Sequence, residues 1–98
     1  MESKQKNEIM FTQLILMFHT AAMQQLGKLK NPLTDTVERN MEAAQNSIDL
    51  LEMLKEKTRG NLGGDESRLL SQVLQELKLN YVDETGKPDP AAEEKPAS

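Results

Sequence analysis

The chain has 98 residues and a formal net charge of −4, which allows one small domain at most. It has no cysteine and one histidine, so it offers no disulfide framework, thiol nucleophile or zinc site. Residues 83–98 carry five acids and two lysines, and the remaining body is close to neutral. A near-neutral body argues against nucleic acid as the main partner, because binding phosphates requires a clustered basic surface.

The N-terminal region does not have the features of a membrane or export segment. Its longest unbroken apolar run is Leu14–Phe18, five residues, far shorter than a membrane span. Glu2 and Glu8 are acidic where a signal peptide would be basic or apolar. We therefore expect a cytoplasmic protein with no membrane span.

A first helix is predicted over residues 8–26, after a frayed segment at residues 1–7. Gly27 and Pro32 favour its termination. Apolar side chains fill about half of its circumference, whereas covering one neighbouring helix needs only about a 100° stripe. The surplus predicts an interface formed by Met10, Phe11, Leu14, Ile15, Met17, Phe18 and Ala21.

This surplus predicts a homo-oligomer, and a two-fold dimer is the favoured form because it is the commonest symmetric assembly. Another cytoplasmic protein is a further candidate partner. The alternative is that the first helix is buried centrally within a single chain.

A second helix is predicted over residues 35–58, opened by Thr34 or Asp35 with Glu38 as the second half of a capping box. Its buried stripe comprises Val37, Met41, Ala44, Ile48, Leu51 and Leu54. A third helix is predicted over residues 65–82, with Asp65 as N-cap and Leu70, Val73, Leu74, Leu77 and Tyr81 buried. The prediction is an all-α, three-helix domain at residues 8–82, followed by a disordered acidic tail at residues 83–98.

The join between the second and third helices has the most specific pattern in the chain. Gly60 is expected to adopt a positive φ that ends the second helix, and Leu62 to fold back on its last turn in a tight helical hairpin. We single out the turn residues Asp49, Lys57, Thr58, Arg59, Gly60, Asn61 and Leu62. Asp49 and Asn61 are expected to make structural hydrogen bonds, Asp49 to a neighbouring helix N-terminus or the turn.

The charged residues do not form a recognisable catalytic set. Glu52 is expected to pair with Lys55, and Glu56 with Arg59, as ordinary exposed helix pairs. His19 lies beside Leu16 and Met23, where a protonatable side chain would make association sensitive to pH. A basic cluster at the hairpin turn comprises Lys55, Lys57, Arg59 and Arg68, with Lys28 and Lys30 expected nearby.

We therefore expect a non-enzymatic interaction module that associates through its first helix, with no catalytic residue, metal or cofactor. One alternative is a binder of small apolar ligands, with a pocket lined by the methionines of the first helix. A further alternative is a weak RNA- or ribosome-associated factor acting through the basic hairpin turn.

The segment Ile48–Leu62, followed by an acidic helix start and a Leu-Leu-x-x-Val-Leu-x-x-Leu helix ending at Asn80-Tyr81-Val82, carries a family resemblance. Together with Ala22–Gly27 and Asn31-Pro32, it resembles the domain of unknown function 1844 family over about residues 11–82. The chain departs from that pattern at Gly63-Gly64, where the family commonly has a hydroxyl residue. The resemblance implies a helical fold and a bacterial, cytoplasmic origin, and no activity, substrate or cofactor.

Overall fold

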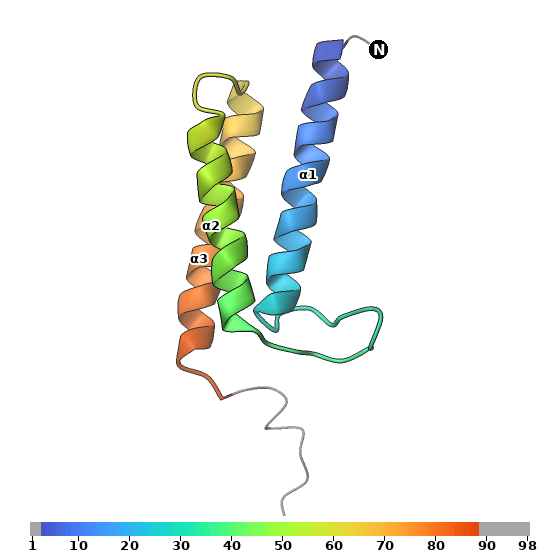
Figure 1. Cartoon of the computed structure of the whole chain (residues 1–98), viewed down its shortest axis with the longest axis vertical. Coiled ribbons are helices and arrows are strands. Elements are labelled where there is room, and N and C mark those ends of the chain that lie inside the picture. The colour runs from blue at the N-terminus through green and yellow to red at the C-terminus, as the bar shows by residue number, and fades with distance from the viewer. Residues whose placement is uncertain (1–2, 89–98) are drawn as a thin grey trace, which may run out of the picture.

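The computed structural model describes residues 3–88, which form three helices: α1 Ser3–Gln25, α2 Met41–Lys57 and α3 Gly64–Thr85. Figure 1 shows α2 and α3 side by side as an antiparallel hairpin, with α1 running along them in the direction opposite to α2. Each helix contacts the other two. The predicted all-α fold is confirmed, and no strand forms within residues 3–88.

A single apolar core lies where the three helices meet. Its buried members are Ile15, Ala22, Leu26, Ala44, Ile48, Leu51, Leu70, Val73, Leu74 and Leu77. On α2 and α3 they recur with helical spacing, and on α1 Ile15 and Ala22 lie seven residues apart, which is two turns, so each helix presents one stripe to the others. The stripe predicted for the third helix is confirmed, with Tyr81 partly buried at its end. The stripe predicted for the second helix is confirmed from Met41 to Leu54, but Val37 precedes α2 and does not belong to the core.

The first helix begins earlier and the third helix ends later than predicted. Helix α1 begins at Ser3, so residues 3–7 are helical rather than frayed. Helix α3 continues to Thr85, three residues into the segment predicted to be disordered. Residues 86–88 are described and not helical, and the rest of both predictions, at residues 1–2 and 89–98, lies outside the described residues.

The predicted start of the second helix at Asp35 is wrong. Helix α2 begins at Met41, and its N-cap is Asn40, whose side chain accepts a 2.9 Å hydrogen bond from Ala43 N. Asp35 instead has a φ of 54°, which no α-helix contains, so no capping box forms with Glu38.

The connection between α1 and α2, residues 26–40, is held by its own hydrogen bonds. Asn31 N donates to Thr36 O at 2.8 Å, and Asn31 O accepts from Asp35 N at 2.7 Å. The Asn31 side chain also accepts from Leu33 N at 2.9 Å, forming a local turn of the type that asparagine favours. The positive φ at Asp35 closes this turn, which is why the helix pattern read from the sequence does not extend through it.

The hairpin turn between α2 and α3 follows the prediction closely. Gly60 has a φ of 83°, and Leu62 packs against the core. The N-cap is the exception, because α3 begins at Gly64 with Gly63 as N-cap rather than at Asp65. Glu66 Oε1 accepts from Gly63 N at 2.8 Å, and this contact orders the start of the helix.

Substituting Gly60 by alanine is expected to lower the free energy of unfolding by about 1–2 kcal/mol, because a β-carbon disfavours the left-handed conformation. Gly86 is a matched control, because nothing lies within 4 Å of a β-carbon at either glycine. Gly86 has a φ of −94°, so Gly86→Ala should not destabilise the protein. Urea denaturation of both variants measures the difference, and equal midpoints would contradict the expectation.

Candidate functional site

The inward side of α1 belongs to the core of the single chain. Ile15 and Ala22 are fully buried, and Phe11 and Phe18 pack against them while remaining partly exposed. The predicted interface is therefore divided by the fold. Ile15 is not part of a surface that a second chain could contact, because its side chain has no exposed surface in the single chain. Phe11 and Phe18 lie at the border between the core and the surface.

A different side of α1 is apolar and exposed. Met10, Leu14 and Met17 have 54%, 39% and 69% of their surface exposed. Together with Ala21 they are spaced four, three and four residues apart, which places all four on one face of the helix. We call Met10, Leu14, Met17 and Ala21 the outer stripe.

The segment of α1 that carries the outer stripe has no formally charged residue. No Asp, Glu, Lys or Arg occurs between Glu8 and Lys28, although 29% of the whole chain is charged. A shallow hollow of about 660 Å³ adjoins the outer stripe at Met17 and Ala21 and is otherwise lined by Gln13, Leu16, Thr20 and Gln24. Ile9 and Leu16, each 46% exposed and seven residues apart, form a second exposed apolar strip on α1.

The hollow continues onto the connection between α1 and α2. A second hollow of about 350 Å³ shares Ala21 and Gln24 with the first and reaches Asn31 and Glu38. Figure 1 shows this connection extending past the end of α1 on the side away from α2 and α3. The outer face of α1 therefore ends against a loop.

The hairpin-turn residues serve the structure of the turn. The Thr58 hydroxyl donates to Leu54 O at 2.8 Å, and Asn61 N donates to Thr58 O at the same distance. Asp49 is exposed and accepts a 2.9 Å hydrogen bond from Gln45 Nε2 on its own helix, so the predicted bond to a helix N-terminus or the turn does not form. Lys57 and Asn61 are exposed, and the group of Asn61 that donates to a turn carbonyl is its backbone N rather than the predicted side-chain amide.

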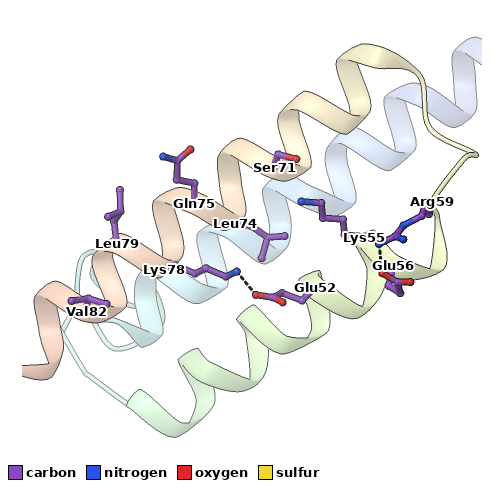
Figure 2. A pocket seen from close by; sticks show the side chains of 10 residues that line it. All are labelled: Glu52, Lys55, Glu56, Arg59, Ser71, Leu74, Gln75, Lys78, Leu79 and Val82. Atoms are coloured by element: carbon purple, nitrogen blue, oxygen red, sulfur yellow. Dashed lines mark hydrogen bonds and ion pairs between the residues drawn. The ribbon is translucent and has the colours of Figure 1, made fainter.

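The acidic residues of α2 form ion pairs, one of them unexpected. Glu56 pairs with Arg59 at 2.6 Å, as predicted. Glu52 pairs with Lys78 of α3 instead of with Lys55. Figure 2 shows this cross-helix pair beside Leu74, in an open groove of about 600 Å³ between α2 and α3. Both pairs are exposed, so each stabilises the fold by less than about 1 kcal/mol.

The basic residues expected around the hairpin turn are not all there. Arg59 is paired with Glu56, and Arg68 with Asp65. Lys28 lies at the opposite end of the molecule, where it contacts the C-terminal end of α3. The predicted grouping of Lys28 with the turn is therefore wrong.

An ionic cluster at that end was not predicted at all. Glu84, whose side chain is 7% exposed, accepts from Lys28 Nζ at 2.9 Å and from Lys87 Nζ at 3.1 Å. Asp83 contacts the same two ammonium groups at 2.8 and 2.7 Å. Arg39 donates to Glu84 O at 3.1 Å and to Lys87 O at 2.9 Å, so the connection caps the last turn of α3.

These contacts change the pKa values of the acidic and basic groups in the cluster. Hydrogen bonds from Lys28 and then Lys87 lower the pKa of Asp83 from 3.8 to about 2. Burial opposes ionisation of Glu84, but hydrogen bonds from Lys28 and Lys87 outweigh it, and its pKa also lies below the ordinary value. Hydrogen bonds to Asp83 and then Glu84 raise the pKa of both lysines.

The depressed carboxyl pKa values predict acid sensitivity. Their stabilisation is complete above the ordinary carboxyl pKa, near 4, and is lost as the pH falls through the folded value, about 2 for Asp83. We expect the free energy of unfolding to fall between about pH 4 and pH 2. The variant Asp83→Asn/Glu84→Gln should show a shallower fall in the same range. Urea titrations across these pH values measure it, and parallel curves would contradict the assignment.

His19 faces α3 rather than the outer stripe. Its Nε2 lies 3.2 Å from Glu76 Oε2 within the same chain. Of the methionines on α1, Met23 packs against the core while Met10 and Met17 are exposed, so they do not line one shared pocket among the described residues. Within residues 3–88, no three His, Asp or Glu side chains gather where they would hold a metal ion.

Comparison with known proteins assigns the chain to a family without assigning it an activity. No helix within the described part of the chain is long and apolar enough to cross a membrane. No curated protein and no solved structure matches the chain. A family model does match. The match begins in the second turn of α1, includes α2 and the hairpin turn, and ends at Asp83, near the end of α3. The chain belongs to the family described as Domain of unknown function (DUF1844), whose model matches residues 8–83.

Proposed function

We propose that this protein is a non-enzymatic interaction module that forms dimers through the outer stripe of α1. The observation that carries the proposal is the exposure of Met10, Leu14 and Met17 within a helical segment that has no charged residue between Glu8 and Lys28. Removing apolar surface from water is favourable by about 25 cal/mol per Å². An exposed apolar helix face therefore favours a partner.

A second copy of the chain fits this face for an electrostatic reason. A surface without formal charge meets its own copy without like-charge repulsion, and a two-fold pair uses the same patch on both subunits. Each Leu14 and Met17 side chain would then be covered by apolar atoms of the other copy.

The size of the face sets the expected affinity. A helix of 23 residues is about 35 Å long and about 10 Å wide, so the covered strip is on the order of 350 Å² per chain. The total of about 700 Å² is below the standard size of a stable protein interface. We expect a reversible dimer that dissociates in the micromolar range.

The test is sedimentation of the full chain over a wide concentration range, with Leu14→Glu/Met17→Glu as the disrupting variant. The wild type should show a monomer–dimer equilibrium, and the variant should remain monomeric with its helical circular dichroism unchanged. The matched control is Leu79→Glu/Val82→Glu, because these two apolar residues on α3 are 65% and 69% exposed. This control should dimerise as the wild type does.

Two outcomes would overturn the proposal. One is a wild-type chain that stays monomeric up to millimolar concentration. The other is a dimer that the Leu14→Glu/Met17→Glu variant leaves intact.

The proposal includes a location in the bacterial cytoplasm. The support for it is the absence of cysteine, which suits a reducing compartment, together with the bacterial origin that the family resemblance implies.

A further inference from the structure

We propose that α1 is a lid hinged at its C-terminal end. The ionic cluster of Lys28, Arg39, Asp83, Glu84 and Lys87 fixes that end, and the N-terminal half swings away from the hairpin turn. The inference does not depend on dimer formation. Two features of the chain carry it: polar contacts that are confined to one half of α1, and an open hollow beneath the other half.

Polar contacts to the other helices hold only the C-terminal half of α1. Gln25 Oε1 accepts a hydrogen bond from Ser47 Oγ of α2 at 2.6 Å. The His19 ring lies 3.2 Å from the Glu76 carboxylate of α3. Among the described residues, no hydrogen bond or ion pair joins residues 3–18 to α2, α3 or the hairpin turn. The first four turns of α1 are therefore held by apolar contacts alone.

The ionic cluster fixes the C-terminal end of α1 to the end of α3. Lys28 lies three residues after the end of α1 and binds Asp83 at 2.8 Å and Glu84 at 2.9 Å. Arg39, which precedes α2, donates to Glu84 O at 3.1 Å. The Glu84 side chain is buried, and hydrogen bonds between charged groups are strong where water has little access. This end of α1 is therefore a fixed pivot.

The opposite end of α1 lies over a hollow. A space of about 700 Å³ is lined by Lys4, Asn7 and Glu8 on the side of α1, and by residues 60–63 and Glu66 on the side of the hairpin turn. Figure 1 shows the ribbons of α1 and α2 diverging toward the start of α1. The two sides of this space are not joined by a hydrogen bond or an ion pair among the described residues.

Few apolar contacts oppose a swing of this half. The first residue of α1 that packs against the core is Phe11, and the first that is fully buried is Ile15. Segments with few buried apolar contacts open at the lowest free energy. Helix α1 contains no proline or glycine, so it moves as one rod and does not kink.

The movement should grow with distance from the pivot. Along the helix, Asn7 lies about 27 Å from Gln25, and Gln24 lies about 1.5 Å from it. A tilt of about 10° moves Asn7 by about 5 Å and Gln24 by less than about 1 Å. The swing uncovers Phe11 and Leu62, which are partly buried against the core. The lid therefore controls access to the end of the core beside the hairpin turn.

Distances between spin labels on the full chain test the swing, because the protein has no cysteine of its own to interfere with labelling. The pair Asn7→Cys/Asn61→Cys spans the hollow beneath the lid. The control pair Gln24→Cys/Ala43→Cys spans the hollow of about 350 Å³ near the pivot. Labelled chains are diluted into excess unlabelled chain, so that only distances within one chain are measured. The distance distribution of the first pair should be about threefold broader than that of the control.

Release of the pivot tests the role of the ionic cluster. Glu84→Gln should broaden the distribution of the control pair about twofold, because the C-terminal end of α1 is then no longer fixed. Lys28→Gln removes the same contact from the other side and should have the same effect. A control pair that both variants leave unchanged would overturn the assignment of the cluster as the pivot.

Hydrogen exchange separates a swing of the whole helix from unravelling of its first turns. In a swing, the amides of residues 8–14 keep their helical hydrogen bonds and should exchange more than about tenfold more slowly than those of an unfolded chain. Unprotected amides there would show unravelling, which overturns the lid. Equally narrow distance distributions for the two labelled pairs of the wild type would also overturn it.

Discussion

Truncating Ile15 to alanine is expected to lower the free energy of unfolding by about 3 kcal/mol, because it leaves a cavity where the three helices meet. Met17→Ala removes a side chain of similar size two residues away and should change stability by less than about 0.5 kcal/mol, since Met17 is 69% exposed. Urea denaturation at low protein concentration, where the monomer dominates, measures both.

The effects of the same two variants on the dissociation constant of the dimer should have the opposite order. Met17→Ala should weaken the dimer because it shortens a side chain of the outer stripe, while Ile15→Ala should leave the affinity of the folded fraction unchanged. Equal destabilisation by the two substitutions would mean that α1 presents a different side to α2 and α3.

Replacing Glu84 by glutamine is expected to lower the free energy of unfolding by about 2 kcal/mol at neutral pH. The carboxylate is buried against Lys28 and Lys87, and Arg39 Nη1 lies 3.5 Å from it. Its loss removes hydrogen bonds between charged groups from a site with little access to water, where they are strongest. Thermal and urea unfolding at pH 7 measure the effect.

Glu56→Gln is the matched control, since Glu56 also pairs with a basic residue. Glu56 and Arg59 are both exposed, so removing this pair should cost less than about 0.5 kcal/mol. If the two substitutions had the same effect, the contact between the connection and α3 would contribute no more than an ordinary surface pair.

The parts of the fold predicted correctly depend on residues close together in the sequence. The buried stripe of α3 recurs every three or four residues, and Gly60 marks the hairpin turn because few other residues adopt a positive φ. The family resemblance centred on Ile48–Leu62 is confirmed by the family match over residues 8–83. Local pattern and backbone preference are sufficient for these features.

The errors lie where particular hydrogen bonds and ion pairs, and not helical periodicity, decide the structure. Asp35 is a residue type that often begins a helix. Here the hydrogen bonds of Asn31 close a turn around it, and α2 begins only at Met41. Glu84 lies in a segment whose composition is typical of a polar tail. Its contacts with Lys28 and Arg39, which are far away in the sequence, keep it helical and buried. The spacing of apolar residues within either segment does not predict those contacts.

The candidate site shows the same division within one helix. The sequence by itself determined that the segment between Glu8 and Lys28 has no charge, while the surplus of apolar surface on α1 stays a prediction. Only the tertiary structure decided that Ile15 belongs to the core and Met17 to the surface. A helical pattern specifies which side chains share a face, but which apolar face is covered depends on how α2 and α3 pack against it.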